Sequence, residues 1–196
     1  MTAVARTEPR HHATTAAWLL AALATASLAR AALNGHATWS AFAAGAAFGV
    51  VLVALAVTAG WRPGAPTLRP LVLGLLGGVV LIAVPRLAHP LVPAVIGMRP
   101  EPFVAWGLIT GIVVLGEEAL VRGALFGALD RAAGPVAAVA VSSIAFALMH
   151  VPLYGWQVVP LDLGVGLWLG GLRLATGGVA APIVAHGLAD LSTWWI

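Results

Sequence analysis

The sequence predicts an all-α protein, a polytopic transmembrane helix bundle of about seven helices (six to eight). Of its 196 residues, 61% are hydrophobic and only 9% are charged, whereas soluble domains carry about 25% charged residues. Apolar stretches of roughly 20 residues, the length that crosses a bilayer, recur along the chain. Turn residues and tryptophans separate these stretches. The chain has too few polar residues to coat a soluble core, so lipid must solvate most of its surface.

A polar segment precedes the first apolar stretch. Residues 1–14 include Arg6 and Arg10 and predict a short disordered cytoplasmic tail. Residues 15–196 predict a single transmembrane helical domain, whose first spanning helix covers about 16–32. Ala29-Arg30-Ala31 loosely fits a signal-peptide cleavage site. The apolar run is long for a signal peptide, however, and further hydrophobic spans follow it, so a spanning helix is the better interpretation.

Six further helices are expected from the remaining apolar stretches. The third stretch contains three prolines, so we expect a helix to about residue 84 followed by a broken or interfacial piece. Pro135 suits the first turn of the fifth helix, and we expect that helix to end near His150, before Pro152 and Gly155. The expected ranges are 37–59, 71–96, 103–129, 135–150, 161–175 and 179–196.

Composition and charge exclude several classes of protein. The ten basic residues are all arginine and are scattered singly, which does not resemble a nucleic-acid-binding surface. The chain has no cysteine, which excludes disulfides, thiolate metal sites and a cysteine nucleophile. With the N-terminus inside, more arginines fall in inside segments than in outside ones. The sequence therefore predicts a multi-pass cell-membrane protein, embedded in membrane lipids, with a cytoplasmic N-terminus. It carries no signal for the oligomeric state.

Ionisable side chains within apolar spans usually mark function or an internal pair, because they are costly there. Depth in the membrane can be estimated at about 1.5 Å per residue from the cytoplasmic end of each helix. This count places Glu117 ~18 Å and His150 ~22 Å from that end of their helices. The same count places His186 ~14 Å and Asp190 ~20 Å along the last helix. Four groups from three helices thus fall at a similar depth, and we expect them to converge.

Helical spacing distinguishes the roles of these groups. Glu118 and Arg122 are four residues apart and can pair on one face. Glu117 points about 100° away and is left for another partner, which suits a general base. His186 and Asp190 are also four residues apart and can present a joint polar face. Small residues nearby would let helices approach closely: Gly116, Gly123, Gly127, Ala145, Gly187 and Ala189.

Three motifs lie in order on successive helices: Glu117-Glu118-x-x-x-Arg122, Phe146-x-x-x-His150 and His186-x-x-x-Asp190. Together they resemble the CPBP family of intramembrane endopeptidases, which includes bacteriocin-processing proteins and type II CAAX prenyl proteases. The resemblance covers about residues 103–196, and the first three spans match only in being hydrophobic. Each motif is weak by itself, but all three on separate helices are a specific signal.

The resemblance implies a role for each matching residue. Glu117 would activate a water for attack on the scissile carbonyl, assisted by His150. His186, with the residue at position 190, would stabilise the oxyanion. Glu118 and Arg122 would hold the site together, with Phe146 as support. The activity implied is hydrolysis of peptide bonds in membrane-associated proteins or peptides.

Asp190 departs from the family pattern. Asn at this position would donate a hydrogen bond to an oxyanion, whereas an ionised Asp is only an acceptor. Asp190 would then be protonated, or orient His186, or ligate a metal. Family members have been described both as glutamate proteases and as metalloproteases, and zinc is the ion that this donor set would take: Glu117, His150, His186 and Asp190.

Other interpretations of the buried groups remain open. The chain could be a non-catalytic membrane protein, either an immunity factor or a proton-coupled transporter, that uses the Glu/His cluster structurally or as a proton relay. The inverted repeats typical of transporters are not visible. Ser142 and Ser143 lack the flanking glycines of a rhomboid-type serine. Asp162 and Asp190 could be proposed as an aspartyl dyad, but the sequence around Asp162 is too generic.

Overall fold

The computed structural model describes residues 9–35, 37–65, 67–87 and 102–195. The described residues form seven continuous helices and no strand, which confirms the all-α bundle. Five of these helices are long and apolar enough to cross a membrane, so this is a multi-pass membrane protein. The helical elements are α1 (Pro9–Leu33), α2 (Thr38–Thr58), α3 (Leu68–Leu87), α4 (Phe103–Glu118), η2 (Ala119–Leu125), α5 (Phe126–Ala133), α6 (Pro135–Tyr154), η3 (Trp156–Val158), α7 (Val159–Thr176) and α8 (Ala180–Ser192).

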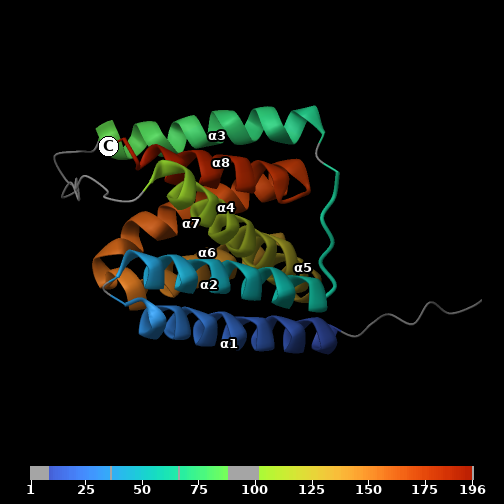
Figure 1. The fold of residues 1–196 in the computed structure, drawn as a ribbon. Coiled ribbons are helices and arrows are strands. Elements are labelled where there is room, and N and C mark those ends of the chain that lie inside the picture. Colours follow the sequence, from blue (N-terminus) through green and yellow to red (C-terminus); the bar gives the residue numbers. More distant parts are fainter. Residues whose placement is uncertain (1–8, 36, 66, 88–101, 196) are drawn as a thin grey trace, which may run out of the picture.

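The helices are arranged around one diagonal helix (Figure 1). α1 and α2 lie side by side on one side of the bundle, α3 and α8 lie on the opposite side, and α4 crosses between them. α6 packs along α7, and α4 continues through η2 into α5 as one unbroken helix. This central helix supplies much of the buried core, including Leu120, Leu125 and Phe126. The two glutamates of the sequence motif therefore lie on the most enclosed helix of the fold.

Glycines let the backbones of α2 and α4 come into direct contact where the two helices cross. A Cβ atom on Gly116 would lie 2.8 Å from the Cα of Gly49, and one on Gly49 would lie 2.8 Å from the carbonyl carbon of Ile112. Neither position has room for a side chain, because the atoms in the way are backbone atoms. Gly116 directly precedes Glu117, so this crossing fixes the depth of the glutamates in the bundle.

Several helix boundaries differ from the expected ones. α1 begins at Pro9, so residues 9–14 are helical rather than part of a disordered tail; residues 1–8 lie outside the described residues. α3 continues to Leu87, and the expected broken piece after it falls in 88–101, also outside them. α6 continues through Pro152 to Tyr154. A proline in the last turn removes a single helical hydrogen bond, and Gly155, with a φ of +83°, ends the helix instead.

The last helix is shorter than expected. α8 has 13 residues, which is ~20 Å of helix and less than the ~20 residues of a full span. The predicted span over 179–196 is therefore too long, because the chain turns after Ser192 and its tryptophans fold back on α4. The ring of Trp194 lies 5.4 Å from Phe103 and 5.1 Å from Trp106.

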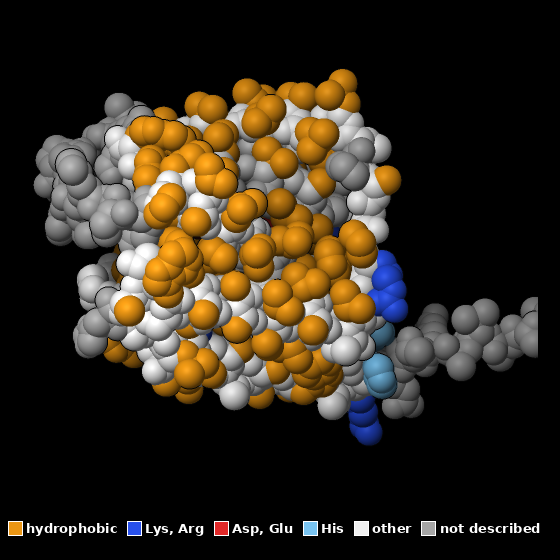
Figure 2. All heavy atoms as spheres, in the orientation of Figure 1, with side chains coloured by type: hydrophobic (Ala, Val, Ile, Leu, Met, Phe, Trp, Pro, Cys, Tyr) orange, Lys and Arg blue, Asp and Glu red, His pale blue; other side chains and the backbone are white. Residues whose placement is uncertain are grey.

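The surface of the bundle is apolar where lipid would contact it. Orange hydrophobic side chains cover the face drawn in Figure 2, and the Arg and His side chains visible there gather at one edge. At this end of the bundle α1 and α3 begin and α2, α5 and α7 end (Figure 1). Five arginines lie there, at or near the helix ends: Arg10, Arg62, Arg69, Arg131 and Arg173. A cytoplasmic position for this end stays a prediction from the positive-inside rule.

Candidate active site

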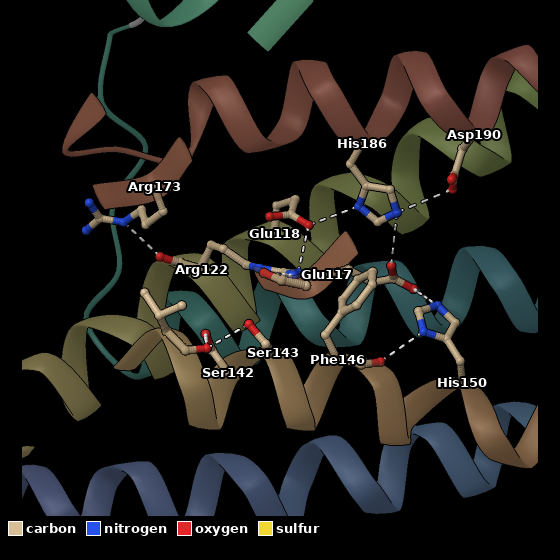
Figure 3. A network of polar contacts seen from close by, with 12 residues as sticks. Glu117, Glu118, Arg122, Ser142, Ser143, Phe146, His150, Arg173, His186 and Asp190 are labelled. Atoms are coloured by element: carbon tan, nitrogen blue, oxygen red, sulfur yellow. Dashed lines mark hydrogen bonds and ion pairs between the residues drawn. The ribbon is translucent and has the colours of Figure 1, made fainter. Parts of the chain in front are cut away.

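Glu117 lies inside the bundle, 2% exposed, at the end of α4. Its Oε1 is 4.0 Å from Nε2 of His150 on α6, and its Oε2 is 3.9 Å from Nε2 of His186 on α8. Figure 3 shows the carboxylate between the two imidazole rings. Oε1 also lies 3.6 Å from Nη1 of Arg30 on α1. The partners that the helical spacing left open for Glu117 are thus two histidines and an arginine.

Two oxygen atoms hold the imidazole of His150 at Nδ1, the ring nitrogen that does not face Glu117. Its Nδ1 lies 2.9 Å from the carbonyl oxygen of Phe146 and 3.3 Å from Oδ2 of Asp162, in the first turn of α7. Both neighbours are hydrogen-bond acceptors, so Nδ1 carries the hydrogen and the Nε2 of a neutral ring presents its lone pair toward Glu117. Sequence reasoning considered Asp162 only as half of an aspartyl dyad. The structure places it against His150.

The imidazole of His186 lies between carboxylates. Its Nδ1 is 2.9 Å from Oε1 of Glu118, and its Nε2 is 3.5 Å from Oδ2 of Asp190 as well as facing Glu117. A ring that donates at both nitrogens is the imidazolium form. The Asp190 side chain is 43% exposed, so it lies at the open edge of the cluster. Of the roles considered for Asp190, orientation of His186 is the one that this contact fits.

Glu118 joins α8 to the core of α4. Its Oε1 accepts a hydrogen bond from Nη1 of Arg122 at 3.0 Å in addition to its contact with His186 (Figure 3). The Glu118 and Arg122 side chains are both fully buried. The expected pair is therefore present, but it belongs to a group of three in which Glu118 also fixes the ring of His186. Sequence spacing on one helix could not reveal the third member.

Phe146 fills the space between the charged groups. The Arg122 guanidinium lies 4.2 Å from the centre of the Phe146 ring, a cation–π contact in a desolvated place. The same ring lies 4.8 Å from the ring of His150 and 5.4 Å from that of His186. Phe146 thus separates the two histidines and packs against the buried cation, which agrees with the supporting position expected for it.

The backbone that follows the glutamates is π-helical. The segment η2 begins directly after Glu118 and contains Arg122. π-Helical turns are rare and occur frequently at functional sites, where they change the direction of side chains. The Arg122 carbonyl accepts a hydrogen bond from Nε of Arg173, and Nη2 of Arg122 lies 3.4 Å from the Gly166 carbonyl oxygen. α7 therefore holds the distorted segment on both sides.

A cavity of about 430 Å³ reaches the cluster. Its lining includes Glu117, His150 and Asp190 of the cluster, together with Arg30, Asn34 and Tyr154. α1 and α6 end, and α2 and α4 begin, at this part of the bundle, opposite the arginine-rich end (Figure 1). The cavity has the size of a small-ligand or short-peptide site.

Comparison with known proteins bears on the segment that contains all three motifs. Residues 99–192 match the family model described as Rce1-like, a type II CAAX prenyl endopeptidase. This segment belongs to that family. The chain matches no curated protein and no solved structure. The matched segment thus begins just before α4 and ends with α8, and the family resemblance of the three motifs is confirmed.

One residue of the cluster lies on α1, outside the matched segment. Arg30 precedes the matched segment, yet its guanidinium contacts Glu117. From the sequence, Arg30 enters only a loose cleavage-site match and the count of arginines in outside segments. An arginine within an apolar span is itself a functional signal, and that signal could have marked Arg30.

Zinc binding depends on how the side chains of the donor set are arranged. Both histidines present Nε2 toward Glu117 and have Nδ1 held by an oxygen atom, which is how zinc-ligating histidines are commonly oriented. No group of three or more His, Asp or Glu side chains in the described ranges is arranged to hold one ion. The separations of 3.9 and 4.0 Å from Glu117 are wider than those between neighbouring ligands of a tetrahedral zinc, about 3.3 Å. In this arrangement the side chains of the described residues do not form a ready zinc site.

The two serines of α6 are packing residues. Ser142 and Ser143 are fully buried and lie 3.3 and 2.7 Å from the carbonyl oxygen of Val139 in their own helix. A Cβ atom on Gly166 of α7 would lie 3.0 Å from the Cα of Ser143, so the two helices meet closely there. These contacts agree with a role as hydrogen-bonding residues within a membrane helix.

Proposed function

We propose that this protein is an intramembrane endopeptidase that hydrolyses peptide bonds of membrane-associated proteins or peptides with a water activated by Glu117. The observation that carries the proposal is the position of Glu117, a buried carboxylate that faces two histidines at 3.9–4.0 Å and lines a cavity of about 430 Å³. These separations are longer than a hydrogen bond and leave room for a water to be held between the groups. Membership of the segment 99–192 in a protease family supports the same conclusion.

Glu117 would act as the general base. Its carboxylate takes a proton from water as the water oxygen bonds to the scissile carbonyl carbon, and the carbonyl π electrons move to the oxygen to form the oxyanion. The proton then passes from Glu117 to the amide nitrogen, the C–N bond breaks, and the oxyanion electrons re-form the carbonyl. The products are an acid and an amine, and Glu117 is again a carboxylate.

His150 would assist this proton transfer. Its Nε2 faces Glu117 because its Nδ1 is held by Phe146 and Asp162. A carboxylate behind an imidazole fixes the ring and stabilises the charge that forms when the ring takes a proton. We therefore assign Asp162 as a positioning residue for His150.

The buried residues of the cluster would hold the side chains of the site in their positions. Glu118 holds Arg122 and His186 together, and His186 in turn faces Glu117 and Asp190. His186 would then present Nε2–H near the developing oxyanion, with Asp190 orienting the ring. This arrangement suits an ionised Asp190, which needs only to accept a hydrogen bond.

The family name suggests the substrate class. The matched family is described as a CAAX prenyl endopeptidase, and we propose a membrane-associated peptide with a prenylated CAAX sequence as the first probe. Zinc also stays a prediction. Elemental analysis of the purified protein, together with the sensitivity of cleavage to chelators, tests it.

The test of the proposed function is Glu117→Gln. Cells producing the wild-type chain or Glu117→Gln are compared by membrane proteomics that maps protein C-termini and internal cleavage sites. We expect an uncut membrane-associated species to accumulate with Glu117→Gln at normal levels of the variant itself, and Asp130→Asn, an exposed carboxylate on α5, to behave as wild type. Identical cleavage patterns for wild type and Glu117→Gln would overturn the proposal and favour a non-catalytic protein.

A further inference from the structure

Arg30 is a cation in an unusual place. It lies on α1 within an apolar helix, its side chain is only 16% exposed, and it lines the cavity that reaches Glu117. A charged group in a membrane-spanning helix is costly and requires a compensating role. Arg30 is the one permanent cation that lines this cavity in the described part of the chain.

The contacts of Arg30 direct its guanidinium toward the reacting groups. Nη1 lies 3.6 Å from Oε1 of Glu117, and the guanidinium carbon lies 4.7 Å from the centre of the Phe48 ring of α2. The aromatic ring supports the guanidinium, as in other cation–π contacts. At 3.6 Å the contact with Glu117 is an ion pair without the short geometry of a hydrogen bond. A substrate carbonyl attacked by a water on Glu117 would therefore come within reach of the same guanidinium.

Peptide hydrolysis requires hydrogen-bond donors where the oxyanion forms. Nε2–H of His186 would supply one such donor, but the carboxylates that line the cavity, Glu117 and Asp190, are only acceptors when ionised. An arginine presents five N–H donors in a rigid plane and does not lose its charge. We propose that Arg30 is a catalytic residue that donates hydrogen bonds to the oxyanion of the tetrahedral intermediate. This inference rests on the proposed function.

The ion pair explains why such an interaction would accelerate the reaction. Before reaction, the positive charge of Arg30 is balanced by the Glu117 carboxylate. When Glu117 takes the proton from water it becomes neutral, and the negative charge appears on the carbonyl oxygen instead. Arg30 then pairs with the oxyanion, so its interaction with the substrate strengthens in the transition state, which is the condition for catalysis.

Two plainer roles for Arg30 give different results on substitution. Arg30 lies in the last turn of α1, where any cation balances the helix dipole, and its pair with Glu117 joins α1 to α4. Lysine keeps the positive charge that both roles need, whereas methionine keeps only the packing on Phe48. Neither provides the planar pair of donors of a guanidinium.

The experiment measures kcat and KM of the full-length protein in lipid vesicles with a quenched fluorogenic peptide carrying a prenylated CAAX sequence. The variants are Arg30→Met, Arg30→Lys and Arg30→Ala, the last also with low concentrations of guanidinium. Arg62→Met is the matched control, because Arg62 is an exposed arginine whose Nη1 bonds to the Val57 and Trp61 carbonyl oxygens of its own segment. Wild type and Glu117→Gln, measured first, establish whether the proposed function holds for this peptide.

We expect Arg30→Met to lower kcat by about 10²–10³-fold, the cost of removing an oxyanion donor, with little change in KM. Arg30→Lys should fall between wild type and Arg30→Met, and guanidinium should partly restore Arg30→Ala. A raised KM with an unchanged kcat would assign Arg30 to substrate binding and overturn the inference, as would a wild-type kcat in Arg30→Met. If Arg30→Met does not fold, the absence of guanidinium rescue in Arg30→Ala overturns it. If wild type cleaves no better than Glu117→Gln, the proposed function fails and this inference fails with it.

Discussion

Glu117 and Glu118 are neighbours in the chain, both are buried, and their surroundings differ. Glu118 is in contact with Arg122 at 3.0 Å and His186 at 2.9 Å, in a place with no solvent access. Glu117 has partners at 3.6–4.0 Å and lines the cavity. One glutamate is held at hydrogen-bond distance, whereas the other is surrounded by groups that leave room for a further molecule.

This difference separates the cluster into a closed side and an open side. The closed side contains Glu118, Arg122 and Phe146 and determines where His186 points. The open side contains Glu117, His150 and Arg30 and faces the cavity. Short contacts around a buried charge favour stability, and longer contacts around a cavity leave a carboxylate able to bind water. Substitutions of Glu118 and Glu117 look alike in the sequence. We expect those of Glu118 to lower stability and those of Glu117 to lower activity.

The largest effect on stability is expected on the closed side. Glu118→Ala leaves the guanidinium of Arg122, which is fully buried, without its counter-charge. Removing one partner of a buried ion pair costs about 3–5 kcal/mol, so we expect a strong loss of thermal stability and of membrane accumulation. Glu117→Gln should keep near-wild-type stability. Equal melting temperatures for Glu118→Ala and Glu117→Gln in detergent would contradict the division into two sides.

Gly116 tests the backbone crossing that supports both sides. In Gly116→Ala the new methyl group would meet the backbone of Gly49, which cannot move aside as a side chain would. We expect a loss of about 1–3 kcal/mol, the usual range for overpacking, together with lower activity because the depth of Glu117 changes. Gly111→Ala on the same helix is the matched control, since a Cβ atom there has nothing within 4 Å. Equal shifts of the melting temperature in Gly116→Ala and Gly111→Ala would show that the two helices do not cross tightly.

Asp162→Asn tests the positioning of His150 on the open side. We expect kcat to fall roughly ten- to a hundredfold with KM and thermal stability unchanged. This is less than the ≈ 10⁴-fold loss for Asp→Asn in a Ser-His-Asp triad, because the Phe146 carbonyl still holds Nδ1 at 2.9 Å. Asp130→Asn serves as the control. An unchanged kcat would mean that Asp162 does not position His150. Its role would then be to stabilise the N-terminus of α7, where an acidic residue is favourable.

Water access distinguishes the two sides most directly. The chain has no cysteine, so a single introduced thiol reports its own environment. A water-soluble, membrane-impermeant thiol reagent should modify Thr110→Cys, which lines the cavity. It should not modify Ser143→Cys, which is fully buried and packs on Gly166, whose carbonyl oxygen contacts Arg122 of the closed side. With the predicted orientation, modification of Thr110→Cys should occur in intact cells without permeabilisation. Modification only after permeabilisation would reverse the orientation while leaving the two sides of the cluster distinct.

Much of the candidate site followed from simple counting along the sequence. Few charges in an apolar chain predicted the helical bundle, and counting residues from helix ends predicted that Glu117, His150 and His186 would meet. Both inferences rely on the fixed rise of a helix. The Glu118–Arg122 pair followed from the spacing of four residues, which brings side chains together within one helix.

Contacts between helices could not be obtained in this way. The Asp162–His150 contact depends on how α7 begins after Gly155, and the Arg30–Glu117 contact depends on the packing of α1 against the rest of the bundle. The π-helical segment after Glu118 also has no signature in the hydrophobic pattern. Each of these features is set by the rotation of one helix against another, which apolar composition leaves undetermined because lipid and protein surfaces are equally apolar.

By itself, the sequence determined that this is a helical membrane protein with buried carboxylates and histidines at one depth, because burial of charge is costly and helix geometry is regular. The tertiary structure decided which glutamate is closed off and which faces the cavity. The two residues differ by one position on the same helix, and only the close crossing at Gly49 and Gly116 and the placement of α1, α6 and α8 give them different surroundings.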